Sequence, residues 1–139
     1  MNQRSFRGQL TTSEQRRIIV DDGRFTHGMR IVALHIFPVI GGGTQLTSVT
    51  LATQEISNPD LDAGDSRQIG WATLGFGAAN TNTQTQAVID PEHVIINDLY
   101  VRNNNINDAV NYLIIAEPIT LTDDQAILQL IKERGQDDL

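Results

Sequence analysis

The chain has 139 residues and no cysteine, so we expect one domain (residues 1–139) stabilised by packing, without disulfides or thiolate chemistry. Its net charge of −7 repels phosphate backbones, so we expect no general nucleic-acid binding. No apolar run is long enough for a membrane span and no secretion signal is visible, so we also expect no membrane partner.

Charge is distributed unevenly along the sequence. Six arginines lie in the first thirty residues: Arg4, Arg7, Arg16, Arg17, Arg24 and Arg30. Five acidic residues lie near the end: Asp123, Asp124, Glu133, Asp137 and Asp138. Oppositely charged ends can meet within one molecule or between subunits, or remain separately solvated.

The first third of the chain predicts an N-terminal arm and two strands. Residues 1–12 form the arm, and residues 16–20 form a strand that a turn at residues 21–23 connects in a hairpin to the next one. That next strand, within residues 27–40, is apolar on both of its alternating sets of side chains. This pattern is typical of a central strand covered on both faces.

The middle of the chain predicts two further strands separated by a loop. Residues 45–53 and 68–76 alternate as strands do, and residues 55–66 are a loop by their Asn-Pro and Ala-Gly-Asp content. In the second strand we place Ile69, Trp71 and Thr73 on one side. The glycines at 41–43 are expected in a flexible hairpin loop, and residues 77–86 in a polar loop or an exposed edge.

Carboxylate and imidazole groups are densest at residues 90–108, which could form a metal site, an acid/base pair or only structure. Residues 93–102 predict a strand, in which His93 and Asp98 point to opposite faces. Asp90-Pro91-Glu92 predicts a turn, and residues 102–108 predict a hairpin connection to a strand at 110–117. We therefore favour the structural interpretation and expect no metal and no cofactor.

The C-terminal segment, residues 122–135, predicts the one helix, at residues 123–134. Thr122 and Gln125 have capping-box spacing, and Asp123 and Asp124 occupy the first turn, where the helix dipole favours anions. One apolar stripe is expected on this helix: Ala126, Ile127, Leu130 and Ile131. Short strands followed by one short helix predict an all-β fold, an antiparallel β-sandwich or jelly roll.

No catalytic motif is visible in the sequence, so we expect no enzyme. An enzyme would require carboxylates such as Asp98 and Glu117 to converge on neighbouring strands. A carbohydrate-binding module would require an exposed aromatic platform, for which the candidates are Trp71, Phe76, Tyr100 and Tyr112. Aromatic residues make up only 5% of the chain, so we favour a core position for them.

Two segments carry a resemblance to a known class of proteins. They are RSFRGQLTTSEQRRIIVDDGRFTHGMRIVALHIFP and HVIINDLYVRNNNINDAVNYLIIAEPITLTDDQAILQLIKERGQD, with a strand, IND-L-YV, N-YLI and an acidic-capped helix in that order. Together they resemble small virion-associated proteins of marine tailed phages, thought of as jelly-roll capsid-decoration or head-associated proteins. Residues 39–86 carry no resemblance.

The resemblance implies a non-enzymatic viral structural protein, bound to the major capsid protein or another virion protein, as a homo-oligomer with a trimer favoured. It implies no cofactor and a location in the virion. The expected partner-binding residues are Arg4, Phe6, Arg7, Arg16 and Arg17, with Phe6 as an apolar anchor and arginines that pair with carboxylates. A disordered N-terminal tail without a role is the alternative for the arm, and a carbohydrate-binding or host-recognition module is the alternative for the whole chain.

Overall fold

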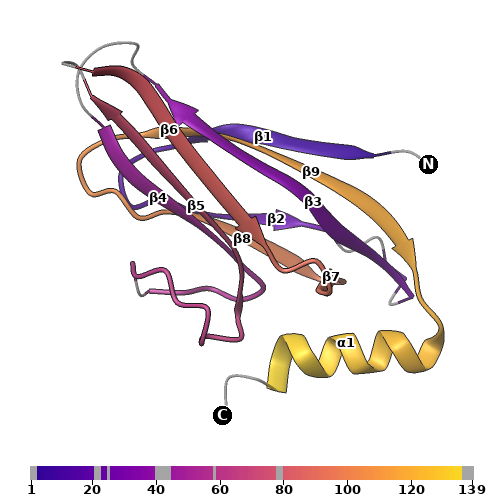
Figure 1. The fold of residues 1–139 in the computed structure, drawn as a ribbon. Coiled ribbons are helices and arrows are strands. Elements are labelled where there is room, and N and C mark those ends of the chain that lie inside the picture. Colours follow the sequence, from indigo (N-terminus) through magenta and orange to yellow (C-terminus); the bar gives the residue numbers. More distant parts are fainter. Residues whose placement is uncertain are drawn as a thin grey trace.

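The computed structural model describes residues 3–20, 23–24, 26–39, 45–57, 59–77 and 80–135. Two antiparallel sheets pack face to face, and a helix lies at one end of them (Figure 1). This arrangement confirms the predicted β-sandwich with one short C-terminal helix.

The described elements follow one another as nine strands and one helix. They are β1 (Arg4–Leu10), β2 (Gln15–Ile19), β3 (His27–Pro38), β4 (Gln45–Ala52), β5 (Gln68–Gly77), β6 (Asn80–Ile89), β7 (Val94–Ile95), β8 (Asp98–Asn103), β9 (Val110–Thr120) and α1 (Asp123–Gly135). The strands form a four-stranded sheet in the order β1-β9-β3-β7 and a five-stranded sheet in the order β2-β8-β4-β5-β6.

The chain alternates between the two sheets at almost every step. Only β4, β5 and β6 are consecutive neighbours in one sheet. When β6 is regarded as an addition beside β5, the other eight strands make two four-stranded sheets wound as in a jelly roll. The predicted jelly roll is therefore the observed topology, with one extra edge strand.

Strict alternation of side chains builds the core between the sheets. On β9 the inward set is Val110, Tyr112, Ile114 and Ala116, all at most 3% exposed. Leu99 and Val101 of β8 and Val49 and Leu51 of β4 face them from the other sheet and are fully buried. Nonpolar side chains that meet in this way supply most of the favourable free energy of folding.

Three predicted hairpins are wrong. Strands β2 and β3 belong to different sheets, as do β3 and β4, and so do β8 and β9. Residues 21–22 and 41–43 of the predicted turns lie outside the described residues, and residues 104–109 connect the two sheets. A turn signal reports a local reversal of the chain and does not say which strand will be the partner, because pairing depends on distant residues.

The predicted N-terminal arm is also wrong, because residues 4–10 form β1. This strand pairs along its whole length with β9, from Arg4 opposite Ala116 to Leu10 opposite Val110. Phe6 and Leu10 point inward and pack with the core. A polar, arginine-containing edge strand resembles a tail in composition, which is why the sequence pattern did not separate the two.

Residues 93–102 form two short strands instead of the predicted single one. β7 pairs with Met29 and Arg30 of β3, and β8 pairs with β2 and β4 in the other sheet. Residues 94–96 are all buried, which strict alternation forbids, because the chain crosses between the sheets at this point. His93 is buried, whereas Asp98 is partly exposed on the outer face of the five-stranded sheet.

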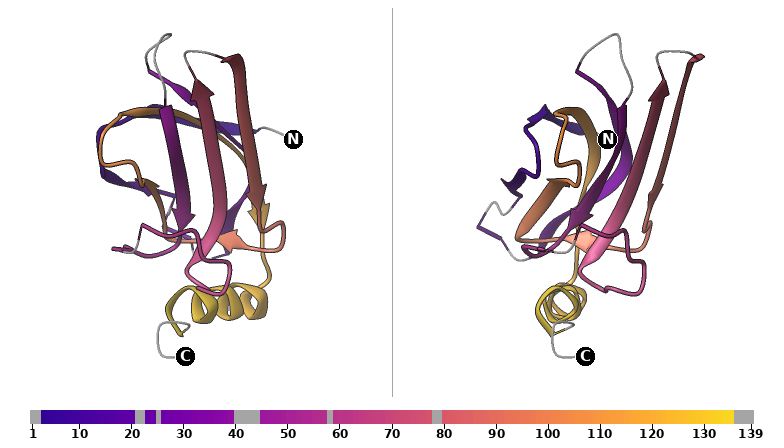
Figure 2. Two further views of the ribbon diagram at one scale, coloured as in Figure 1. Left: turned by 60° about the vertical axis from the view of Figure 1, so that its left-hand side comes forward. Right: turned by 90° about the vertical axis from the view of Figure 1, so that its left-hand side faces the viewer.

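The C-terminal helix begins where the sequence predicts. The Thr122 N–H donates to Gln125 Oε1 (3.0 Å), and the Gln125 N–H donates to Thr122 Oγ1 (3.3 Å), which is the predicted capping box. Of the expected apolar stripe only Ala126 is buried, and Ile127 and Ile131 are exposed. The helix lies across the end of the sandwich and covers neither sheet, so little apolar surface is available to it (Figure 2).

Candidate interaction surfaces

The five residues predicted to bind a partner do not share one surface. Arg4 and Arg7 lie on opposite sides of β1, and the Arg4 guanidinium stands 5.6 Å from the centre of the Phe6 ring. Phe6 is half-buried against the core and is not an exposed anchor. Among these three residues only Arg7 projects from the outer face of the four-stranded sheet, beside Leu113 of β9.

Arg16 is a structural residue at the edge of the sandwich where β1 and β2 meet. Its guanidinium donates to the Gln9 carbonyl (2.9 Å), to Glu14 Oε2 (2.9 Å) and to the Tyr112 hydroxyl (3.4 Å). A Cβ on Gly8 would stand only 2.6 Å from Arg16 Nη1, so glycine leaves room for the guanidinium. Arg16 thus links the two sheets through structural hydrogen bonds.

The charges around Arg16 change its protonation and that of its neighbour. The hydrogen bond with the Tyr112 hydroxyl raises the pKa of Arg16 most, and Glu14 adds to the effect. The carboxyl pKa of Glu14 is lowered, chiefly because the Thr11 N–H donates a hydrogen bond to it (2.8 Å). Both groups are held in their charged forms, as expected for a structural ion pair.

Asp98 and Glu117 do not converge. Asp98 pairs with Arg17 (3.0 Å) on the outer face of the five-stranded sheet. Glu117 pairs with Arg30 (3.3 Å) on the outer face of the four-stranded sheet. The two carboxylates therefore point away from each other, and the paired-carboxylate hypothesis is wrong. In the described part of the chain, no group of three or more His, Asp and Glu side chains could hold a metal ion.

The outer face of the four-stranded sheet has an apolar segment in the middle of its two central strands, beyond the Arg30–Glu117 pair. Opposite the buried set of β9, Leu113 and Ile115 point outward, and Ala33 and Phe37 of β3 lie on the same face, with the exposed His35 between them. We call these four residues the apolar face. Phe37 is 49% exposed, and no described helix or strand covers the face (Figure 2). The sequence predicted cover on both sides of β3, and the single chain supplies it on one side only.

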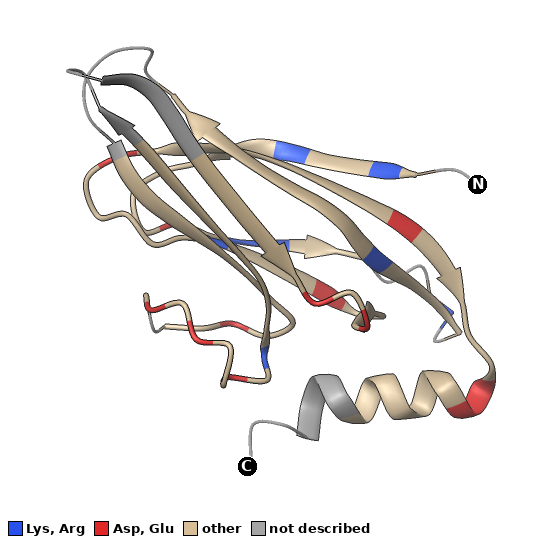
Figure 3. Cartoon of the chain, in the orientation of Figure 1, with Lys and Arg blue, Asp and Glu red and all other residues tan. Residues whose placement is uncertain are grey.

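The part of the outer face of the five-stranded sheet over β4, β5 and β6 has the opposite character, because it is polar but uncharged. Strands β4, β5 and β6 contain no charged residue, and charged groups lie mainly elsewhere (Figure 3). Ser48, Thr73 and Gln86 stand side by side across these three strands. Next to this row, Trp71 lies between Thr50 of β4 and Val88 of β6.

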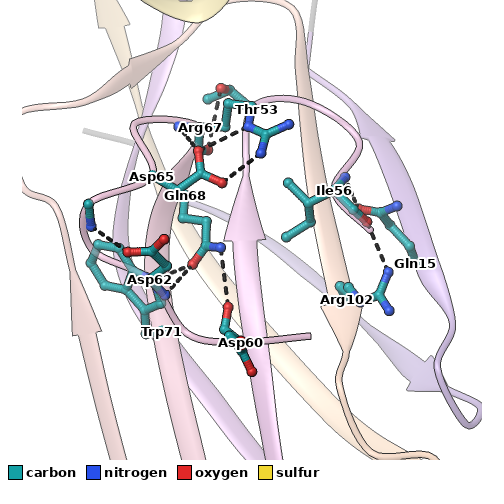
Figure 4. Close-up of polar contacts among 11 residues, drawn as sticks. Gln15, Thr53, Ile56, Asp60, Asp62, Asp65, Arg67, Gln68, Trp71 and Arg102 are labelled. Carbon is teal, nitrogen blue, oxygen red and sulfur yellow. Dashed lines mark hydrogen bonds and ion pairs between the residues drawn. The ribbon is translucent and has the colours of Figure 1, made fainter. Parts of the chain in front are cut away.

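Trp71 is held in place by the loop that precedes β5. Its indole N–H donates to Gln68 Oε1 (2.7 Å), which also accepts the Asp62 N–H (2.9 Å), and Gln68 Nε2 donates to the Asp60 carbonyl (3.3 Å) (Figure 4). Arg67 closes the loop through two bonds to the Asp65 carboxylate, which lower the pKa of Asp65. The ring is thereby fixed on the outer face of the sheet.

Asn104 organises the other side of the polar row. Its Nδ2 donates to Ser48 Oγ (3.1 Å) and to Thr50 Oγ1 (2.9 Å), and its Oδ1 accepts from Arg102 Nε (3.1 Å). Beside these residues the surface is hollowed over about 1050 Å³. The hollow is lined by Leu46, Thr47, Ser48, Thr73, Leu74, Gly75, Thr85, Gln86, Asn104, Asn105 and Ile106, and none of them is charged.

The aromatic residues are divided between core and surface. Tyr112 is buried, as predicted, but Trp71 and Tyr100 are partly exposed on the outer face, and the side chain of Phe76 lies outside the described residues. Trp71 and Thr73 share one side, as predicted, whereas Ile69 is buried. Ile69 is the extra residue of a bulge, because Gly70 pairs with Leu51 and Gln68 pairs with Ala52. The small residues Gly70 and Ala72, alternating with Trp71, were the available signal that Trp71 faces outward.

Comparison with known proteins identified no relative of this chain. No family model, no curated protein and no solved structure matches it. The described helix is neither long nor apolar enough to cross a membrane.

Proposed function

We propose that this protein is a non-enzymatic structural protein of a virus particle, which assembles with copies of itself and binds the major capsid protein or another virion protein. The observation that carries the proposal is the apolar face. In the middle of two central strands of one sheet, nonpolar side chains point to both sides, and the chain covers only the inner side. A second molecule would complete the cover.

The energetics favour such a cover. Full burial of one leucine, isoleucine or phenylalanine side chain contributes about 1.5–3 kcal/mol, and contiguous apolar patches on soluble proteins commonly mark interaction sites. Arg7 borders the patch beside Leu113, where it would meet carboxylates of a partner with bidentate geometry. Of the predicted partner-binding arginines, Arg7 is the one that we retain for this role.

The virion part of the proposal is supported by the topology and by the resemblance of the two terminal segments. Jelly rolls recur in viral capsid proteins, and they also occur in lectins and cupins, so the fold is an analogy and not a functional assignment. The trimer remains a prediction. A chain that self-assembles needs no cofactor, and the proposal includes none.

The direct test is the molar mass in solution, measured by light scattering after size-exclusion chromatography. We expect a wild-type oligomer and a monomer for Leu113→Glu and for Phe37→Glu, because each places a charge within the apolar face. The matched control is Val88→Glu, the same kind of change at an exposed aliphatic residue of the opposite sheet, which should leave the mass unchanged.

Circular dichroism must show that each variant is folded. Phe37 is more exposed than Leu113, so Phe37→Glu remains a valid test if Leu113→Glu unfolds the protein. A monomeric wild-type protein at high concentration would reject self-assembly. The virion part has its own test, mass spectrometry of particles purified from the virus that encodes the chain. Absence of the protein from those particles would reject this part alone.

A further inference from the structure

We propose that the outer face of the five-stranded sheet binds a neutral oligosaccharide in the hollow beside Ser48, Thr73 and Gln86. This inference is independent of the assembly proposal, because it concerns the opposite face of the sandwich. It follows from the lining of the hollow, the alternation of polar and apolar rows, and a fixed tryptophan.

The lining selects an uncharged ligand. The eleven residues around the hollow include no acid and no base, in a chain whose net charge is −7. A phosphate or sulfate ester would find no cation there, and a cationic ligand would find no carboxylate. Hydroxyl and amide side chains remain, and they are suited to donate to and accept from sugar hydroxyls.

The rows across the sheet match the two kinds of surface that a sugar ring presents. Ser48, Thr73 and Gln86 form a polar row over three strands, which spans roughly 10 Å at a strand spacing of about 4.8 Å. Trp71 and Val88 form an apolar row on one side of it. On the other side, Leu46 and Ile106 are each 75% exposed and line the hollow. Sugar hydroxyls can meet the polar row while C–H faces rest on the apolar ones.

The hydrogen bonds already present leave the polar row ready to donate. Ser48 Oγ accepts from Asn104 Nδ2, so the Ser48 hydroxyl proton is directed away from that bond. Thr73 and Gln86 are exposed. A peptide that adds a strand would pair at the free edge of β6 and not over the hollow, because the backbones of β4 and β5 are paired on both sides.

The indole ring supplies the platform. It is the only tryptophan in the chain, and its N–H is fixed by Gln68, which is itself 4% exposed. A pre-oriented ring loses little conformational entropy when it contacts a ligand. The loop of residues 59–67 therefore has a role in this site, since its backbone holds Gln68 in place.

The test uses the full chain and a printed array of neutral glycans, followed by NMR titration of isotope-labelled protein with cellotriose, maltotriose, laminaritriose and N-acetylchitotriose. The indole N–H signal of Trp71 reports binding directly. We expect at least one probe to shift this signal together with amides of β4 and β5.

Variant Thr73→Val removes one hydroxyl with little change of shape, and it should weaken binding roughly tenfold, the equivalent of one hydrogen bond of about 1.4 kcal/mol. Thr120→Val makes the same change on the four-stranded sheet and should bind as wild type. The inference is overturned if no neutral glycan binds, if Thr73→Val binds as tightly as wild type, or if the shifted amides lie on the other sheet.

Discussion

Asn103 is a fully buried polar residue at one end of the sandwich, and its replacement gives the sharpest stability prediction. Its side chain is fully buried and makes four hydrogen bonds. Nδ2 donates to the carbonyls of Thr11 (3.0 Å) and Asp108 (2.9 Å), and Oδ1 accepts from Thr47 Oγ1 (3.0 Å) and from the Asn105 N–H (3.0 Å). One side chain thereby joins three loops or strands at this end of the sandwich.

The variant Asn103→Leu keeps approximately the same shape and removes all four bonds. Each net hydrogen bond contributes about 1 kcal/mol, so roughly 4 kcal/mol is lost, and burial of the leucine offsets about 1 kcal/mol of it. We therefore expect the free energy of unfolding to fall by about 3 kcal/mol, a large part of the 5–15 kcal/mol typical of a domain.

The assay is urea unfolding followed by the fluorescence of Trp71, at one protein concentration for all variants because self-association would shift the midpoint. Asn107→Leu is the matched control: it is the same substitution at an exposed residue of the same connection, and should change stability by less than about 0.5 kcal/mol. A loss below about 1 kcal/mol for Asn103→Leu would refute the hydrogen-bond argument.

Two further predictions concern the edge of the sandwich and the acidic groups. Gly8→Ala should lower the unfolding free energy by about 1–2 kcal/mol, because the new methyl group displaces the Arg16 guanidinium from Tyr112. Urea unfolding measures this loss, and an unchanged midpoint would contradict the proposed link between the two sheets through Arg16. The pKa values of Glu14 and Asp65 are lowered in the folded protein. The two carboxylates therefore stabilise the fold fully when the pH is above their ordinary pKa values of about 4, and this stabilisation is lost as the pH falls through the lowered pKa values. The double variant Glu14→Gln/Asp65→Asn should therefore show a smaller loss of stability on acidification, and an identical pH profile would count against these two interactions.

Local patterns in the sequence predicted the fold class because they are set by local chemistry. Alternation identified the strands, and the Thr122 and Gln125 spacing identified the start of α1. Partner choice between strands was not predictable in this way. Residues 104–109 have the composition of a hairpin turn, yet they connect two sheets, since Asn103 and Asn105 bond to residues far away in the chain.

The candidate surfaces were only partly predictable for the same reason. Both sides of β3 are apolar in the sequence, which correctly identified a strand that needs cover, but the pattern could not show that the chain leaves one side open. Trp71 was expected in the core because aromatic residues are scarce. The bulge at Ile69 shifts the alternation by one residue, and a bulge leaves no clear mark in a single sequence.

The pairing of β1 with β9 has a consequence for how the protein is made. β9 lies between β1 and β3, so the four-stranded sheet lacks its second strand until the last fifth of the chain is available. During synthesis on the ribosome, β1 and the apolar β3 would remain without their main hydrogen-bonding partner until β9 is made. Such long-range pairing predicts slow folding that is completed after release, with the most apolar strand exposed in the interval. Efficient production would then depend on chaperones or on slow synthesis.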